Sequence, residues 1–288
     1  MIGQYTEEEL AQLHTVLYEI LGEVDRVCSL LDIPYCLIGG SGIGAFFEKA
    51  ILPWDDDIDL GMTRENYQRF QREAPALLRP EYELQNVYTD PHCPYYFAKL
   101  MKRNTLFEEA LFSKVPMMKG IFVDIFPLDK VPDAPRPQLL QRKVGQFINC
   151  CLMGKEIWMW KHFGKCQVEH PTNRGALPCL LTRIVCALFS KMQIYRVLEW
   201  WCSRYNRRND CTYYNLVLFP RDHISVDSME HPQRLPFGPL VVPTPRDLEI
   251  YLNNHYPGLT RYVPKEKQAN HHPMRLCFNT ADEREQAR

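Results

Sequence analysis

The first thirty residues show a regular pattern of apolar positions. Leucine, isoleucine and valine recur at steps of three and four between residues 10 and 31. This spacing predicts a long amphipathic helix. Thr6 precedes it and Glu9 follows three residues later, which is the arrangement of a capping box. Pro34 lies beyond the last apolar position, so we expect the helix to end near residue 31.

Short apolar runs separated by polar and turn-forming residues follow this helix, and they predict strands and short helices. We expect strands at 35–38, 57–62, 82–88, 95–102 and 121–126, and helices at 41–49 and 63–78. Such an alternation of strands and helices predicts an α/β fold in which helices flank a mixed sheet.

The middle of the chain has a different composition. Residues 135–210 have a helical pattern rich in Trp and Cys, with 13 Lys/Arg against 4 Asp/Glu, a local net charge of +9 in a chain of net charge −1. We therefore predict a catalytic core at 1–134, a basic helical insertion at 135–210, strands and a helix that complete the core at 211–264, and a mobile tail at 265–288. The positive charge indicates an anionic partner (a nucleotide, a phospholipid surface or a phosphorylated glycan) or an ordinary solvated helical face.

The overall composition is that of a soluble globular protein, with 45% hydrophobic and 24% charged residues among 288. Eleven cysteines in a chain of this size, without an apolar leader, predict a cytoplasmic protein with reduced thiols. No apolar run reaches the roughly 18 residues that span a bilayer. We expect at most a peripheral contact with the cytoplasmic face of the membrane, and no nucleic-acid partner.

Carboxylates are concentrated around the predicted strand 57–62. Because side chains alternate along a strand, Asp57 and Asp59 point to one face while Ile58 and Leu60 point into the core. Two carboxylates about 6–7 Å apart on one face repel each other unless a cation lies between them. A hard divalent cation, Mg²⁺ or Mn²⁺, is held by such a pair, and phosphate oxygens of a substrate complete its coordination shell.

A third carboxylate and a glycine turn extend this pattern. Asp124 interrupts the apolar run 121–126 and would be costly to bury without a partner. We expect it to join the same cation cluster and to act as the general base for an acceptor hydroxyl. The glycine-rich segment 39–44 follows a strand and supplies backbone N–H groups that can face phosphates. Together these features predict an enzyme that transfers phosphate groups.

Other motifs are weaker. The segment GSGIGA at 40–45 fits a dinucleotide-binding pattern, but Pro53 leaves only about two helical turns after it. No G-x-S-x-G motif is present, which argues against a serine hydrolase. His162, Cys166 and His170 are spaced by four and could share a metal, although surface or core positions are favoured. Four tryptophans are expected in the core or around a cationic ligand: Trp158, Trp160, Trp200 and Trp201.

The order of these motifs resembles the LicD family. GGSGIGA at 39–45 and LPWDDDID at 52–59 are similar to its first signature, and GIFVDIFPLD at 120–129 is similar to its second. The resemblance implies a nucleotidyltransferase-type fold and a phosphotransferase. Family members move phosphocholine from CDP-choline onto cell-surface glycans, and their fukutin-like relatives move ribitol phosphate from CDP-ribitol.

The resemblance also implies roles for individual residues. It places metal at Asp57, Asp59 and Asp124, joined in some members by Asp55, and donor phosphates at Gly39, Gly40 and Ser41. The Tyr-Gly pair that is usual near the end of the family's domain is replaced by the sequence HYPG at 255–258, a position where the donor or acceptor substrate could be recognised. We expect Mg²⁺-dependent transfer of phosphocholine from a CDP-linked donor to a glycan or lipid-linked glycan. Another CDP-alcohol, a nucleotidyl group, or a non-catalytic glycolipid-binding protein remain the alternatives.

Overall fold

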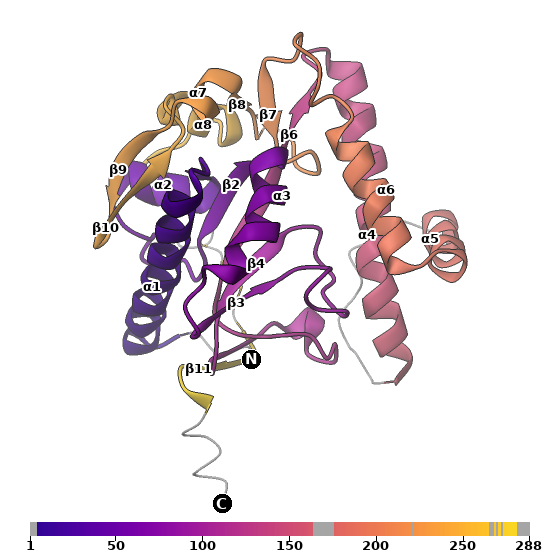
Figure 1. Cartoon of the computed structure of the whole chain (residues 1–288), viewed down its shortest axis with the longest axis horizontal. Helices are drawn as coiled ribbons and strands as arrows, with labels where there is room; N and C mark the ends of the chain where they lie inside the picture. The colour runs from indigo at the N-terminus through magenta and orange to yellow at the C-terminus, as the bar shows by residue number, and fades with distance from the viewer. Residues whose placement is uncertain are drawn as a thin grey trace, which may run out of the picture.

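A seven-stranded mixed sheet forms the centre of the molecule, flanked by helices (Figure 1). The computed structural model describes residues 5–163, 176–220, 222–264, 268, 270–271 and 273–280. Five strands follow one another in the order β1 (Cys36–Leu37), β2 (Asp59–Thr63), β6 (Phe122–Val131), β4 (Ala98–Lys102) and β3 (Tyr82–Gln85). The pair β2–β6 is parallel and the other pairs are antiparallel. The predicted mixed α/β arrangement is therefore confirmed.

Two helices cover one face of the sheet. These are α1 (Glu7–Leu31) and α3 (Arg64–Glu73), which is followed by the short 3₁₀ helix η1 (Ala74–Ala76). The predicted capping box is present, because the Thr6 side chain accepts from the backbone N–H of Glu9 while the Glu9 side chain accepts from that of Thr6. Buried apolar residues of α1 and α3 pack with Ile58, Leu60, Val123 and Ile125 in one core cluster. The polar residues that alternate with them, Asp59 and Asp124, must then project from the opposite face.

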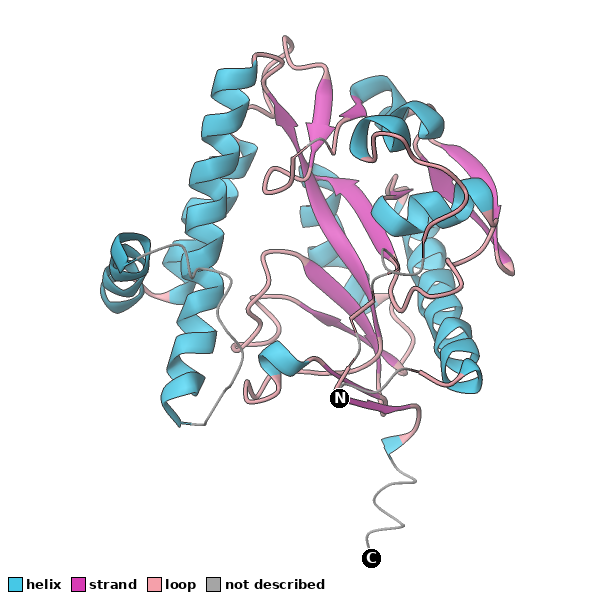
Figure 2. Ribbon diagram, turned by 180° about the vertical axis from the view of Figure 1, so that it is seen from behind, coloured by secondary structure: helices cyan, strands magenta, loops and turns pink. Residues whose placement is uncertain are grey.

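A helical layer stands beside the sheet and contains α4 (Pro135–Phe163), α5 (Ala176–Leu188) and α6 (Lys191–Ser203). Seen from behind, α4 is the long helix at one edge of the molecule, with α5 outside it (Figure 2). Apolar residues of α4 and α6 pack with Phe126, Leu128 and Val131 of β6 in a second core cluster. The same strand extends beyond β2 to pair with β7 (Tyr213–Asn215), which in turn pairs with β8 (Ile224–Ser225). The helical character predicted for this part of the chain is present.

The remaining elements complete the core around α2 (Gly39–Phe47). They are the hairpin β9 (Gln233–Phe237) and β10 (Leu240–Thr244), with a turn at Gly238, and the helices α7 (Val226–Glu230) and α8 (Leu248–His255). Beyond Asn215, where β7 ends, residues 216–218 are buried without strand pairing.

The C-terminal segment differs from the expected mobile tail. Residues Arg275–Cys277 form β11, which pairs with β5 (Leu106–Glu108), just before the short helix η2 (Ala110–Phe112). The apolar side chains of Leu276 and Phe278 pack against the core cluster under α1, which explains why this polar segment is held in place. None of the helices in the described ranges is long and apolar enough to cross a membrane.

Candidate active site

Three of the predicted carboxylates converge at the parallel pair β2–β6. Asp59 lies directly opposite Asp124 in the register, and Asp57 precedes β2 on the same side. One carboxylate oxygen from each of these three residues lies within 4.8 Å of the other two. The backbone N–H of Asp124 donates to the carbonyl of Ile58 at 2.9 Å, so pairing of the strands fixes the distance between the acids.

The glycine turn positions the strand that carries Asp59. The side chain of Ser41 is buried, and its Oγ accepts a hydrogen bond from the backbone N–H of Asp59 at 2.9 Å. Gly39 has a φ of +56°, a left-handed conformation that glycine adopts without strain, and its N–H donates to the Tyr251 hydroxyl at 2.9 Å. Tyr251 in turn donates to buried Asp222 at 2.7 Å. A chain of hydrogen bonds thus fixes the start of α2 beside the acids.

Repulsion and burial raise the pKa values of the clustered acids. Burial is the main reason that the pKa of Asp59 lies well above its usual value, and the charges of Asp57 and Asp124 add to the effect. Burial also raises the pKa of Asp124 to about 7, although Lys99 opposes this change. Asp55 has a pKa raised to about 8 by burial and by the charge of Asp57. The cluster therefore carries more negative charge than the protein around it stabilises.

Lys99 of β4 is the buried cation closest to Asp124. Its side chain is only 3% exposed, and its Nζ lies 3.4 Å from Asp124 Oδ1 and 3.6 Å from Glu109 Oε2. The ring of Phe122 lies on its other side, with the centroid 3.2 Å from Nζ. Asp124 Oδ1 is nevertheless buried without a hydrogen-bond partner among the described residues, because the geometry toward Lys99 is poor. This oxygen has free capacity for a further ligand.

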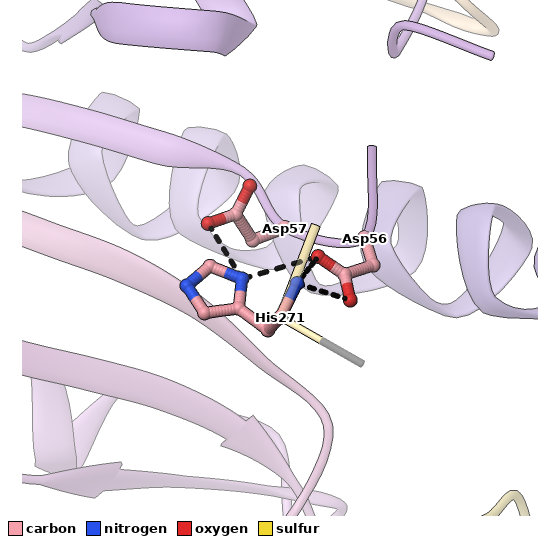
Figure 3. A group of neighbouring side chains, drawn as sticks. All are labelled: Asp56, Asp57 and His271. Atoms are coloured by element: carbon pink, nitrogen blue, oxygen red, sulfur yellow. Dashed lines mark hydrogen bonds and ion pairs between the residues drawn. The ribbon is translucent and has the colours of Figure 1, made fainter. Parts of the chain in front are cut away.

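His271 brings a second positive charge to the acids from the C-terminal segment (Figure 3). Its Nδ1 lies 3.1 Å from Asp56 Oδ1 and 3.5 Å from Asp57 Oδ2, and its backbone N–H also donates to Asp56. The hydrogen bond with Asp56 raises the pKa of His271 to about 10 against the opposing effect of burial. A protonated imidazole cannot ligate a metal, so His271 is a counter-charge for Asp57 in this arrangement.

Asp56 itself anchors the chain rather than lining the cluster. Burial would raise its pKa, but hydrogen bonds from His271 and from the hydroxyl of Tyr5, at 2.6 Å, lower it below the usual value. The three consecutive acids of the motif thus divide their tasks. Asp57 faces the cluster, and the carboxyl of Asp55 is hydrogen-bonded to that of Asp57. Asp56 instead accepts hydrogen bonds from Tyr5 in the N-terminal segment and from His271 in the C-terminal segment.

A cavity of about 710 Å³ opens next to the cluster. Asp55, Asp57 and Asp59 form part of its wall, together with Gly40. Residues 255–260 and 262–264 form much of the opposite wall and include Tyr256 and Tyr262, while Trp54 adds a third aromatic ring. The HYPG stretch, expected to contact donor or acceptor, therefore lines this cavity.

The three converging acids fit a divalent cation. They offer oxygen ligands only, which hard cations such as Mg²⁺ and Mn²⁺ prefer, and they leave Asp124 Oδ1 without a hydrogen bond. Asp55, the fourth predicted ligand, is not part of this group of three, but its carboxyl adjoins the group through the hydrogen bond with Asp57. Its raised pKa keeps Asp55 protonated at neutral pH, where it donates to Asp57.

The glycine turn, the His/Cys motif and the tryptophans, which were also predicted as functional or core positions, lie in different environments. Gly40 lines the cavity, and a side chain there would approach Asp55 Oδ2 to 2.8 Å, whereas Ser41 is engaged with the strand. Cys166 and His170 lie outside the described residues, as do the side chains of His162, Trp158 and Trp160. Trp201 is partly buried and donates to the carbonyl of Gln141 at 2.8 Å, whereas Trp200 is 65% exposed, which excludes a core position but not the alternative of contact with a cationic ligand.

Lys99, Glu109 and His271 were not foreseen from the sequence. Lys99 is an isolated lysine inside an apolar strand segment, which is the one sequence signal that could have found it, since a buried lysine requires an acidic partner. His271 lies 214 positions from Asp57 in a polar stretch, and nothing local in the sequence connects the two.

Comparison with known proteins supports the resemblance to LicD. Residues 32–143 match the family model described as LicD/FKTN/FKRP, nucleotidyltransferase domain. The chain carries a LicD-family domain. A relative, the lipopolysaccharide cholinephosphotransferase LicD of Haemophilus influenzae, is 28% identical over 274 residues, covering 91% of this chain and 96% of that protein. An uncharacterized protein of Rickettsia typhi is 25% identical over 118 residues, 40% of this chain and 38% of its own length. The predicted family and its enzyme class, transferases of phosphate-containing groups, are confirmed.

Proposed function

We propose that this LicD-family protein transfers phosphocholine from a CDP-linked donor to a hydroxyl of a cell-surface glycan or glycolipid, with Mg²⁺ or Mn²⁺ as cofactor. The convergence of Asp57, Asp59 and Asp124 beside a cavity of about 710 Å³ is the observation that carries this proposal. The full-length similarity to a lipopolysaccharide cholinephosphotransferase supports the choice of donor and acceptor. The parallel pair β2–β6, which carries two of the acids, supports a sheet of the nucleotidyltransferase type.

Asp57, Asp59 and Asp124 would hold the cation. When bound, it would offset the negative charge of the donor diphosphate and of the phosphoryl group in transfer. In the first turn of α2 the Gly39 N–H is bonded to Tyr251, whereas the N–H groups of Gly40 and Ser41 lack partners within the helix and are available to phosphate oxygens at the cavity wall. These are the groups that we propose for donor binding, in keeping with the glycine motif.

Asp124 is the proposed general base. Its Oδ1 has no hydrogen bond from the described residues and is therefore open to an acceptor hydroxyl. The acceptor oxygen forms a bond to the phosphorus that carries choline, and the bond from this phosphorus to the bridging oxygen breaks. CMP leaves, the acceptor proton passes to Asp124, and atoms and charge balance without another reactant.

Two cations position the acids. Lys99, held between Asp124, Glu109 and the ring of Phe122, keeps Asp124 in place. His271 holds Asp57 from the other side of the cluster. Neither is proposed to react with substrate. Both reduce the repulsion between carboxylates while the site has no cation, since opposite charges at this distance favour the ionised carboxylate.

The cavity wall favours a cationic alcohol over a neutral one. Trp54, Tyr256 and Tyr262 supply aromatic surface, and the described residues of the wall include no Lys or Arg. The one positive charge described there, His271, is paired with Asp56 and Asp57. Quaternary ammonium groups bind aromatic faces by cation–π attraction. Choline meets this description, whereas ribitol and glycerol do not.

A donor screen tests the proposal. The purified protein would be incubated with Mg²⁺, a lipopolysaccharide acceptor and one of CDP-choline, CDP-ethanolamine, CDP-ribitol or CDP-glycerol, and CMP release would be measured. We expect CDP-choline to be used best. Preference for a neutral alcohol would replace phosphocholine by another phospho-alcohol, and release of pyrophosphate from CTP would indicate nucleotidyl transfer. Binding of glycolipid without turnover of any donor would leave a non-catalytic binding protein.

A further inference from the structure

Helix α5 carries a row of exposed apolar side chains. Leu180, Leu181, Ile184 and Leu188 are 54, 45, 45 and 71% exposed, and Phe189, directly after the helix, is 47% exposed. Positions 180, 184 and 188 are spaced by four and therefore share one side of the helix. Large apolar side chains gathered in this way on a surface mark a site of interaction rather than ordinary solvent exposure. We call these five residues the α5 face.

The opposite side of α5 is fixed to α4. Cys186 is buried, and its Sγ donates to the carbonyl of Cys151 at 3.2 Å. Lys155 Nζ donates to the carbonyls of Cys186 at 2.5 Å and Phe189 at 3.0 Å, which ties down the end of the helix. Both views place α5 at the outer edge of the molecule, with α4 between it and the sheet (Figures 1 and 2). The α5 face thus points away from the side that the protein itself covers.

Exposed arginines accompany this apolar surface. Arg183 is exposed on α5, and the next helix exposes Arg196 beside Val197 and Trp200, which are 50 and 65% exposed. No Asp or Glu occurs from residue 170 to residue 198. A helix with a row of Leu, Ile and Phe next to arginines has the composition of helices that lie in the surface of an anionic bilayer.

We propose that the protein docks on an anionic phospholipid surface through the α5 face. Its apolar side chains would enter the boundary between headgroups and acyl chains, and Arg183 and Arg196 would contact lipid phosphates. A second copy of the chain is the competing occupant. A symmetric contact would bring one basic face against another, and this repulsion disfavours it.

Vesicle co-sedimentation with the full chain tests the proposal. Vesicles of phosphatidylcholine alone would be compared with vesicles that contain about 30% phosphatidylglycerol, at low salt and at about 0.5 M salt, where charges are screened within a few ångströms. We expect binding to the anionic vesicles that weakens with salt, and at least tenfold weaker binding to the neutral ones. Equal binding to both, or to neither, would overturn the proposal.

Matched variants locate the contact on α5. The triple variant Leu181→Gln, Ile184→Gln, Leu188→Gln should lower the partition coefficient at least tenfold, because each apolar side chain contributes to insertion. Arg183→Gln should lower it about fivefold at low salt and little at high salt. The control Leu30→Gln, Val241→Gln removes apolar side chains that are 62 and 53% exposed elsewhere, and it should bind within twofold of the parent.

Folding and self-association are separated from lipid binding by two further measurements. The altered side chains are exposed, so the triple variant should melt within a few degrees of the parent. Light scattering would measure the oligomeric state of both proteins. A dimer that the triple variant dissociates, together with absent vesicle binding, would make the α5 face an interface between copies and contradict the proposal.

Discussion

The two halves of strand β6 each carry a buried aspartate, Asp124 in the first half and Asp129 in the second. Their surroundings differ in a way that distinguishes a structural residue from a residue of the candidate site. Asp129 is 1% exposed and accepts from Arg64 Nε at 3.0 Å, Arg64 Nη2 at 2.5 Å and Asn206 Nδ2 at 2.7 Å. Asp124 faces other carboxylates, with Lys99 at 3.4 Å in a poor hydrogen-bonding geometry. The carboxylate of Asp129 is thus fully paired within the protein, whereas that of Asp124 can still bind a ligand.

The difference shows how a buried acid can be assigned a role. A bidentate arginine with a further amide satisfies a carboxylate and makes it part of the fold. A carboxylate that faces two others, with a pKa raised to about 7, is maintained at a cost in stability. Such a cost is typical of functional sites, and the two carboxylates that Asp124 faces, Asp57 and Asp59, line a cavity.

Loss of a cluster acid should have the largest effect. We expect Asp57→Asn or Asp59→Asn to reduce transfer below detection, because each removes a charged ligand of the cation. Each change also removes a repulsion, so the metal-free variants should melt at or above the temperature of the parent. Initial rates and thermal melts measure both effects. Asp227→Asn, a change at an exposed acid, serves as the control. Activity within tenfold of the parent in either cluster variant would end the assignment.

Asp124→Asn should separate binding from turnover. Removal of a general base lowers the rate by about 10²- to 10⁴-fold, and loss of a cation ligand adds to this. Asp57 and Asp59 remain, so affinity for the CDP-linked donor in the presence of Mg²⁺ should be retained. Calorimetry and initial rates on the same preparation measure the two quantities. Loss of donor affinity in proportion to the rate would make Asp124 a donor ligand only, and an unchanged rate would make it a structural residue like Asp129.

Asp129→Ala should affect the fold instead of the chemistry. The change leaves Arg64 buried without its main partner, and breaking a buried ion pair in this way costs about 3–5 kcal/mol. Urea unfolding would measure this loss. The fraction that remains folded should still gain stability from Mg²⁺ or Mn²⁺. A variant with normal stability but without metal-induced stabilisation would show that the two ends of β6 do not differ as described.

The contribution of His271 should be smaller, because it acts through Asp57. Changing a residue that positions a metal ligand usually costs 10- to 100-fold in metal affinity or activity. We expect His271→Ala to fall in this range and His271→Gln, which can still donate a hydrogen bond, to fall less. Calorimetric titration of Mn²⁺ provides the measurement. An effect as large as that of Asp59→Asn would indicate that His271 itself contacts substrate or metal.

The metal-free protein should lose stability as the pH rises. Asp55 and Asp124 have pKa values of about 8 and about 7 in the fold, against 3.8 for an ordinary aspartate, so the folded state binds more protons than the unfolded state between these values. The free energy of unfolding therefore falls from about pH 4 to about pH 8. A divalent cation bound by Asp57, Asp59 and Asp124 displaces the proton of Asp124, so its stabilising effect should grow with pH. Melting curves with EDTA or Mn²⁺ across this range test the expectation, and Asp59→Asn should flatten the metal-free dependence.

Much of the fold and the core of the site could be predicted from local patterns. Periodicity and a capping box define α1, and alternation along the strands places Asp57, Asp59 and Asp124 on one face. Contacts between distant segments could not be predicted in this way. The pairing of β11 with β5, which holds the C-terminal segment, depends on tertiary packing. The hydrogen bond from the Asp59 N–H to Ser41 could not be predicted either, because a serine hydroxyl after a glycine can bind a phosphate or a backbone N–H equally well.

Titration of Mn²⁺ into the metal-free protein by calorimetry tests the central claim most directly. The parent and the Asp227→Asn control should bind the ion with equal affinity, whereas Asp59→Asn should bind it more than about a hundredfold more weakly, beyond the range expected for a positioning residue, because it loses one of three charged ligands. Equal affinity in all three proteins would contradict the claim that Asp57, Asp59 and Asp124 form a cation site, and with it the proposed chemistry of transfer.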